Sequence, residues 1–351
     1  MRVRGATRFA TLFGLALVIT PLDGANALPA CRPGLSLSPS DAEALADAGC
    51  TLTGRVITLN AARLHVPPPG NQVTVHALTT TGEQSISVRV DENGRVSVTA
   101  EDATTRMTSR HAPAATVPPP EECFSSAYQQ KSGDRLPQDR VLNWFYNGAG
   151  EPRAGFYMAV WLGADNMTYG VNDCGLATAV FGISHVASPG SVLRADIDSN
   201  AMCAFFDDDL NVVDWGELPA GTLGVSCSWT INTVPCILAN QCFTASDVRF
   251  NSTARWFVAD EVPEPGVEPL CLVANSSTTF GGYDLMGVSA HEFGHVWGLG
   301  HVSESTDPRM TMSTATGVCD FSERFIGLGD YVGMCERWCV PQPPGMRHGD
   351  V

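Results

Sequence analysis

The chain has little positive charge. Its 351 residues hold 21 Lys and Arg against 37 Asp and Glu, and Lys131 is the single lysine. The formal net charge of −16 argues against electrostatic binding to nucleic acid or to an anionic membrane surface. We therefore expect no nucleic-acid partner. Low-complexity repeats are also absent, and the 44% hydrophobic content indicates a globular protein.

Long hydrophobic runs are scarce as well. One apolar run, Phe9–Ile19, follows three arginines and precedes the small residues of Ala25–Ala27. This run is shorter than the ~20 residues that a membrane-spanning helix needs. The layout is typical of a secretory signal peptide, which we place at residues 1–27. We expect a secreted, extracellular protein without a membrane span.

Cysteine, in contrast, is abundant. Twelve cysteines all follow Ala27, and an even count in a secreted chain predicts disulfide bonds. Cys335 and Cys339 are four residues apart, as metal ligands can be, but no second pair has matching zinc-finger spacing. We therefore expect disulfides there too, although the spacing does not give their connectivity.

Residues 28–112 differ from the rest of the chain. A short helical stretch near residues 40–49 precedes runs in which polar and β-branched residues alternate, which predicts a small antiparallel sheet. These runs are Arg55–Leu59, Val73–Ala77, Ile86–Val90 and Val96–Thr99. The proline-rich residues 113–122 then predict a linker. We expect a small β-rich pro-domain or accessory domain at 28–112.

Residues 123–340 show a mixed pattern. Strands are predicted at 141–146, 223–229 and 246–250, and helices at 172–187, 284–298 and 328–338. Helices and strands do not alternate regularly, so the predicted class is α+β. The proline-rich residues 341–351 are expected to form a loose tail.

One motif has the residue types and spacing of a metal-binding site. Residues 291–301 read HEFGHVWGLGH. His291 and His295 are four residues apart, so a helix projects both imidazoles from one face. Gly298 can end that helix in the left-handed conformation, which lets His301 return to the same point. Three imidazoles and one water form an open catalytic zinc site, and Glu292 can serve as general base. The alternative is an amphipathic helix whose histidines have no metal role.

The region from Cys123 to Cys339 resembles the matrixin-type metzincins, the clan of matrix metalloproteinases and their bacterial relatives. His291, His295, His301 and Glu292 match the clan pattern position by position. The resemblance implies a twisted mixed sheet with an active-site helix and a C-terminal helix. It also implies a methionine turn beneath the metal, for which Met310 and Met312 are candidates and Met312 is preferred.

The resemblance extends to further segments. Asp247–Asn251, with Ala254–Phe257 after it, resembles the strand that lines the cleft edge in that fold. Three features depart from the family pattern. Val302 follows the third histidine where Ser is frequent, Ser313-Thr314 replaces the usual Tyr-Pro after the methionine, and no cysteine-switch motif is present.

These residues predict a zinc endopeptidase with one catalytic Zn²⁺. Glu292 would take a proton from water and deliver it to the leaving amine. An extended protein or peptide substrate would lie antiparallel along a strand, and residues 313–327 would shape the specificity pocket. A bound Ca²⁺ is left open, and we expect a monomer. The alternatives are a zinc hydrolase with a non-protein substrate and an inactive binding protein.

The role of residues 28–112 has two readings. A pro-domain would block the cleft until the linker is cut, and an accessory domain would help folding or bind substrate; we favour the pro-domain. Several acidic residues there could offer a carboxylate to the zinc: Asp41, Glu43, Asp47, Asp91, Glu92, Glu101 and Asp102.

Overall fold

The structure is a computed structural model that describes residues 31, 36–104, 121–131, 140–231, 243–258, 282–302, 309–318 and 320–339. The predicted signal peptide, the tail at 341–351 and all but the last two residues of the predicted linker lie outside the described residues. Among the described helices, none combines the length and apolar character that crossing a membrane requires.

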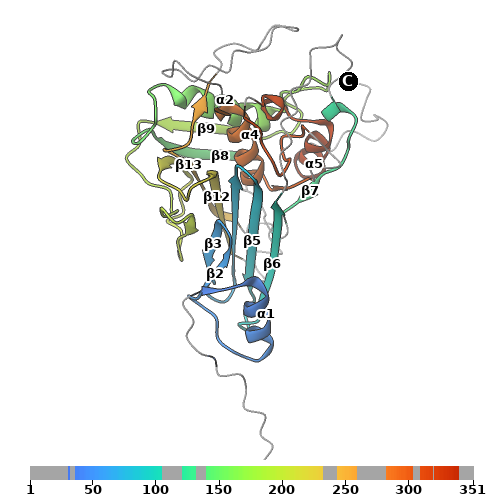
Figure 1. The fold of residues 1–351 in the computed structure, drawn as a ribbon. Coiled ribbons are helices and arrows are strands. Elements are labelled where there is room, and N and C mark those ends of the chain that lie inside the picture. Colours follow the sequence, from blue (N-terminus) through green and yellow to red (C-terminus); the bar gives the residue numbers. More distant parts are fainter. Residues whose placement is uncertain are drawn as a thin grey trace, which may run out of the picture.

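The largest sheet of the described structure has eight strands in the order β6-β5-β4-β12-β13-β11-β8-β9 (Figure 1). β4, β5, β6, β12 and β13 are antiparallel neighbours, whereas β13, β11, β8 and β9 run parallel. The strands are β4 Asn71–Thr79, β5 Gly82–Val90, β6 Val96–Thr104, β8 Val141–Asn147, β9 Ser184–Pro189, β11 Val212–Gly216, β12 Thr222–Ile231 and β13 Phe243–Asn251.

Three smaller sheets complete the strands. A four-stranded sheet has the order β1-β2-β3-β10, and two two-stranded sheets pair β14 with β15 and β16 with β7. Their bounds are β1 Ser36–Leu37, β2 Val56–Leu59, β3 Ala62–His65, β7 Gln129–Gln130, β10 Met202–Cys203, β14 Trp256–Phe257, β15 Tyr283–Asp284 and β16 Leu299–Gly300.

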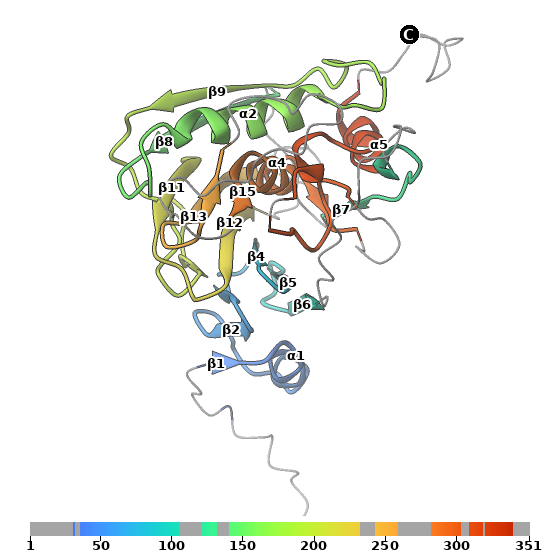
Figure 2. The same cartoon turned by 45° about the horizontal axis from the view of Figure 1, so that its top comes forward.

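The described helices are α1 Pro39–Asp47, α2 Phe156–Tyr169, α4 Leu285–Val296 and α5 Leu328–Trp338, with 3-10 turns η1 Glu121–Cys123 and η2 Ser322–Arg324. Helices α2, α4 and α5 lie together at the end of the molecule away from α1 (Figures 1 and 2). α2 and α4 pack against each other and share one core with β8, β11 and β13. Trp144, Trp215, Phe293 and Trp297 are fully buried in that core. The predicted mixed α+β class is confirmed.

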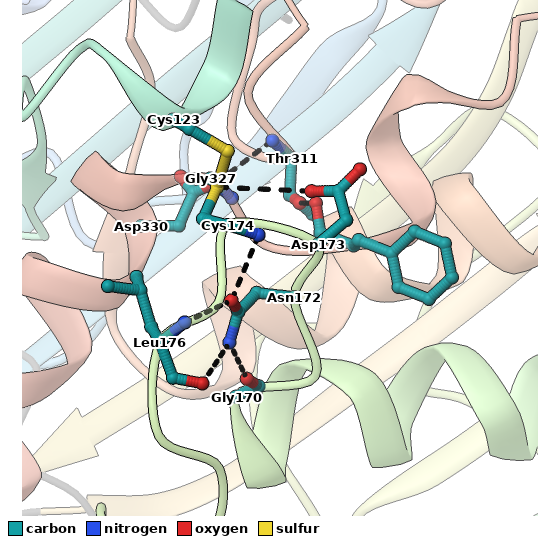
Figure 3. The surroundings of a disulfide bond; sticks show 10 residues. Cys123, Gly170, Asn172, Asp173, Cys174, Leu176, Thr311, Gly327 and Asp330 are labelled. Carbon is teal, nitrogen blue, oxygen red and sulfur yellow. Dashed lines mark hydrogen bonds between the residues drawn. A yellow bond between two sulfur atoms is a disulfide. The ribbon is translucent and has the colours of Figure 1, made fainter. Parts of the chain in front are cut away.

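Most of the predicted elements are present, but the helix predicted at 172–187 is wrong. The helix in this region is α2, which ends at Tyr169 before Gly170 with a φ of +71°. Asn172 then organises a loop: its Oδ1 accepts from Cys174 N at 3.1 Å and Leu176 N at 2.9 Å, while its Nδ2 donates to Gly170 O at 2.7 Å (Figure 3). The later part of the segment forms β9, whose parallel partner is β8.

The N-terminal sheet does not stand apart from the rest of the chain. β4 pairs with β12 from Thr222 opposite Thr79 to Ile231 opposite Asn71. A second core joins the two regions, because Val73 and Val75 of β4 pack in one cluster with Val225 and Trp229 of β12. The expectation of an independent domain at 28–112 is therefore not confirmed.

Disulfides link four pairs of the described cysteines. They are Cys31–Cys50, Cys123–Cys174, Cys203–Cys227 and Cys335–Cys339. Cys335 and Cys339, the pair whose spacing also suited a metal, are thus bonded to each other. Cys236, Cys242, Cys271 and Cys319 lie outside the described residues.

The strand that resembled a cleft edge is in the interior of the sheet. Asp247–Asn251 belongs to β13, which has β11 on one side and β12 on the other. Both edges of β13 are therefore used in pairing. The strand next to it on the side of the N-terminal region is β12. Alternation of apolar and polar residues indicates that a strand is buried but not where it lies in the sheet. The sequence therefore could not distinguish an edge strand from an interior strand.

Candidate active site

Helix α4 carries the first two histidines, and its start is held by a buried ion pair. Asp284 caps the helix by accepting a hydrogen bond from Gly287 N at 3.1 Å. Arg324 donates to both carboxylate oxygens of Asp284, at 2.6 and 2.8 Å. Every residue of α4 except Met286 is buried. The cap and the ion pair therefore fix a helix that the core encloses.

The helix ends where the motif needs the chain to turn. Gly298 has a φ of +93°, and a Cβ at this position would overlap the guanidinium of Arg337. Arg337 Nη1 donates to the Gly298 carbonyl at 3.1 Å. Beyond the turn, Leu299–Gly300 pairs with Gln129–Gln130, which directs His301 back toward the helix.

The three imidazoles converge through their Nε2 atoms. His295 Nε2 lies 3.0 Å from His291 Nε2 and 2.9 Å from His301 Nε2. His291 Nδ1 lies 2.7 Å from Thr311 O, and His295 Nδ1 lies 3.0 Å from Leu299 O. A carbonyl only accepts, so both Nδ1 atoms carry the proton and both Nε2 atoms present lone pairs.

This arrangement fits a metal ion. Neutral Nε2 atoms about 3 Å apart have no proton to share, so their lone pairs repel unless a cation lies between them. Imidazole nitrogen is a preferred ligand of zinc, and outer carbonyls that fix the tautomer are typical of zinc-bound histidines. The donor set and its orientation therefore match the predicted zinc ligands.

Glu292 lies fully buried beside the first histidine. Neither of its carboxylate oxygens has a hydrogen-bond partner among the described residues. Burial raises the pKa of Glu292 to about 7. Gly224 of β12 borders the carboxylate, because a Cβ there would lie 2.6 Å from Glu292 Oε1. An unpaired carboxylate with a pKa near neutrality suits a general base.

Met312, the preferred methionine, lies against α4. A Cβ on Gly294, between His291 and His295, would overlap Met312 Sδ. The carbonyl of Met312 accepts from Val302 N at 2.9 Å, which ties the turn to the residue after His301. Met310 instead contacts the start of α5, near Gly327. Of the two candidates, Met312 is the one that contacts α4 at Gly294, between the first two histidines.

Glu83 of β5 reaches the same point and was not expected. Its Oε2 lies 2.9 Å from His291 Nε2, and its Oε1 lies 3.1 Å from His295 Nε2 and 2.5 Å from His301 Nε2. The side chain is fully buried.

Two more N-terminal side chains approach the histidines. The ring of His76, on β4, stacks on His295 with centroids 3.8 Å apart. Glu101, which the sequence did single out, has Oε2 3.7 Å from His301 Nδ1, on the outer side of that ring. Glu101 is thus the acidic candidate that lies beside one of the three histidines.

The sequence offered one signal for Glu83. It is an acidic residue directly after Gly82, at the start of a strand whose first five residues are all buried. A carboxylate on a buried strand needs a cation or hydrogen-bond donors to compensate its charge. The position of Glu83 therefore indicates that another part of the chain supplies such a partner. The identity of the partner depends on the pairing of β4 with β12, which residue spacing does not encode.

Comparison with known proteins identifies one family. Residues 229–318 match the family model of the peptidases called matrixin. A search of curated proteins finds no match. Among solved structures, metalloproteinase-II from Bacteroides fragilis is similar, with 12% identity over 78% of each chain and a TM-score of 0.27. A TM-score this low carries no argument about fold or mechanism.

The matched segment spans α4, the turn at Gly298 and the methionine turn. It includes all three histidines, Glu292 and Met312. The family match and the convergence of the imidazoles are independent observations, one of sequence and one of geometry. Residues 229–318 of this chain are thus similar to the matrixins in sequence, over the segment that carries the histidines.

Proposed function

We propose that the chain is a secreted zinc endopeptidase. The match to the matrixin family suggests a zinc metalloprotease, and His295 and His301 lie with His76 and Glu83 in a group of side chains that could hold a metal ion. The observation that carries the proposal is the convergence of His291, His295 and His301 beside the unpaired carboxylate of Glu292. Four disulfides among the described residues and the predicted signal peptide support secretion.

The three histidines would hold one zinc ion through Nε2. When bound, zinc supplies Lewis acidity that polarises a carbonyl and lowers the pKa of water. Glu292 accepts a proton from the attacking water and passes it to the nitrogen of the leaving amine. The peptide bond breaks, a carboxylic acid and an amine form, and Glu292 returns to its starting state.

The geometry also suggests how a peptide would be oriented. β12 runs antiparallel to β13 and borders Glu292 at Gly224. An extended peptide paired with the other side of β12 would place its backbone near the histidines. The predicted pocket segment, 313–327, begins with Ser313–Thr316, which are buried next to the methionine turn. We propose that this segment sets side-chain preference and that the protein acts as a monomer.

A peptide-library digest tests this function. The mature protein is compared with Glu83→Ala, which removes the carboxylate that contacts all three histidines. Both proteins are loaded with zinc and incubated with a mixed peptide library, and the products are identified by mass spectrometry. We expect internal cleavage that a chelator abolishes and added zinc restores. A zinc-loaded protein that cleaves no peptide in either form contradicts the endopeptidase assignment. Hydrolysis of ester substrates alone would favour the non-protein alternative.

A further inference from the structure

We propose that Glu83 is a fourth ligand of the zinc and that the hairpin β4–β5 keeps the enzyme latent by occupying its cleft. This inference rests on the proposed function and adds its regulation. Sequence reasoning left open whether residues 28–112 restrain or assist the enzyme. The contacts of Glu83 and β4 favour restraint, and they identify the atoms involved.

The first argument is the position of the Glu83 carboxylate. Its two oxygens lie between 2.5 and 3.1 Å from all three Nε2 atoms. An open catalytic zinc site has three protein ligands and leaves the fourth position to water. A carboxylate in contact with all three nitrogen ligands is placed to take that fourth position. With Glu83 bound, no water can be activated there.

The second argument is electrostatic. A fully buried carboxylate is costly unless a cation compensates it. Three Nε2 atoms surround it, that of His301 at 2.5 Å and those of His291 and His295 at 2.9 and 3.1 Å. The Nε2 atoms of His291 and His295 present lone pairs because their Nδ1 atoms donate to backbone carbonyls. Lone pairs and carboxylate oxygens repel each other, so a cation among these groups stabilises the arrangement. One zinc ion with Glu83 as ligand provides that cation.

The third argument is the pairing of β4. It runs antiparallel along β12, where an extended substrate would lie, and Leu78 is opposite Gly224 beside Glu292. The backbone groups of β12 that would orient a substrate are therefore used by β4. On the neighbouring strand, Glu83 is opposite Leu78. The hairpin thus blocks peptide pairing with one strand and delivers the ligand from the other.

Cobalt substitution tests the ligand directly. Co²⁺ replaces zinc in the mature protein, and its visible absorption reports the ligand set. We compare the wild type with Glu83→Gln and with Glu43→Gln, a matched control on the exposed face of α1. Glu83→Gln should change the cobalt spectrum, weaken metal binding at least tenfold and raise peptidase activity at least tenfold. Glu43→Gln should match the wild type in all three.

A second measurement uses an added metal ligand. Acetohydroxamate binds zinc or cobalt through two oxygens and requires an open position. It should leave the cobalt spectrum of the wild type unchanged at concentrations that alter the spectrum of Glu83→Ala. An immediate response of the wild type, or identical spectra for the wild type and Glu83→Gln, would overturn the ligand assignment.

The two proposals fail in different ways. If Glu83→Gln changes the cobalt spectrum but no form cleaves peptides, Glu83 is a ligand and the endopeptidase function is wrong. If the wild type already cleaves peptides as fast as Glu83→Gln, latency is wrong and the endopeptidase function stands. Each result therefore assigns the failure to one proposal.

Discussion

At the scale of single residues, the active site depends on carboxylates that are buried for different reasons. Glu292 has no hydrogen-bond partner among the described residues, which leaves it free to accept a proton. Glu83 is surrounded by imidazoles. Asp330 accepts from Thr311 N at 2.9 Å and Gly327 N at 3.0 Å, and so holds the methionine turn against α5. We propose that Glu292 is the base and Glu83 the inhibitor, whereas Asp330 holds the methionine turn in place.

The role of Glu292 gives the first prediction. Glu292→Gln keeps the size of the side chain but removes the base, so zinc content should be unchanged. Hydrolysis should fall by roughly 10²–10⁴-fold, the range typical for loss of a general base. The substitution is made in whichever of the wild type and Glu83→Ala is more active. Turnover close to that of the parent, at full zinc content, would contradict the assignment.

Asp330 gives a prediction about pH and stability. Burial raises the pKa of Asp330 from 3.8 to about 6, although three backbone donors oppose the shift. The folded chain therefore holds this proton at pH values where the unfolded chain has lost it. Between about pH 4 and pH 6, the contribution of Asp330 to stability falls as pH rises, by roughly 1–3 kcal/mol.

The measurement is urea unfolding of the wild type and Asp330→Asn at pH 4.5 and pH 7.5. Asparagine does not titrate, so the difference between the two proteins isolates the group. The stability advantage of the wild type over the variant should be larger at pH 4.5. An advantage that stays constant or grows at pH 7.5 would contradict the direction of the pKa shift.

At the scale of elements, α4 depends on the pair formed by Asp284 and Arg324. Arg324→Gln leaves the Asp284 carboxylate buried without its charge partner, and breaking such a pair costs about 3–5 kcal/mol. We expect a loss of about 3 kcal/mol in the free energy of unfolding. Arg89→Gln, on an exposed position of β5, should change stability by less than about 0.5 kcal/mol. Equal effects of the two substitutions would mean that the pair does not hold the helix.

Elements differ in how well the sequence predicts them. The helix predicted at 284–298 is α4, Leu285–Val296, because apolar spacing and a glycine stop are local signals. The helix predicted at 172–187 is wrong because Asn172 and the Cys123–Cys174 disulfide stabilise a loop instead. The sequence also missed β3, a strand of only four residues.

The site shows the same division between local and long-range information. His291, Glu292, His295 and His301 lie within eleven residues, so their convergence follows from helix geometry and one turn. Glu83 is more than 200 positions away from His291. It joins them only because β4 pairs with β12, and strand pairing over such a separation leaves no pattern in residue spacing.

At the scale of the whole molecule, the two cores are joined through one sheet. β4 and β12 share the second core, and β3 pairs with β10 as well. Cutting the chain in the proline-rich segment breaks neither contact. We therefore expect that a chain cut between residues 113 and 120 keeps its two fragments together in native size-exclusion chromatography and stays latent.

Non-reducing denaturing gels provide the control, because none of the described disulfides joins the two sides of the cut. The fragments should separate there. Separation already under native conditions would show that the shared core does not hold the N-terminal region.

The pairing of β4 with β12 within one chain has a consequence for how latency responds to concentration. An inhibitor on a separate molecule is lost on dilution, whereas a tethered strand meets its cleft at an effective concentration that the chain itself sets. Each molecule carries one inhibitory strand for one cleft. Latency should therefore be the same at nanomolar and at micromolar protein, and an external peptide must exceed that effective concentration before it can compete.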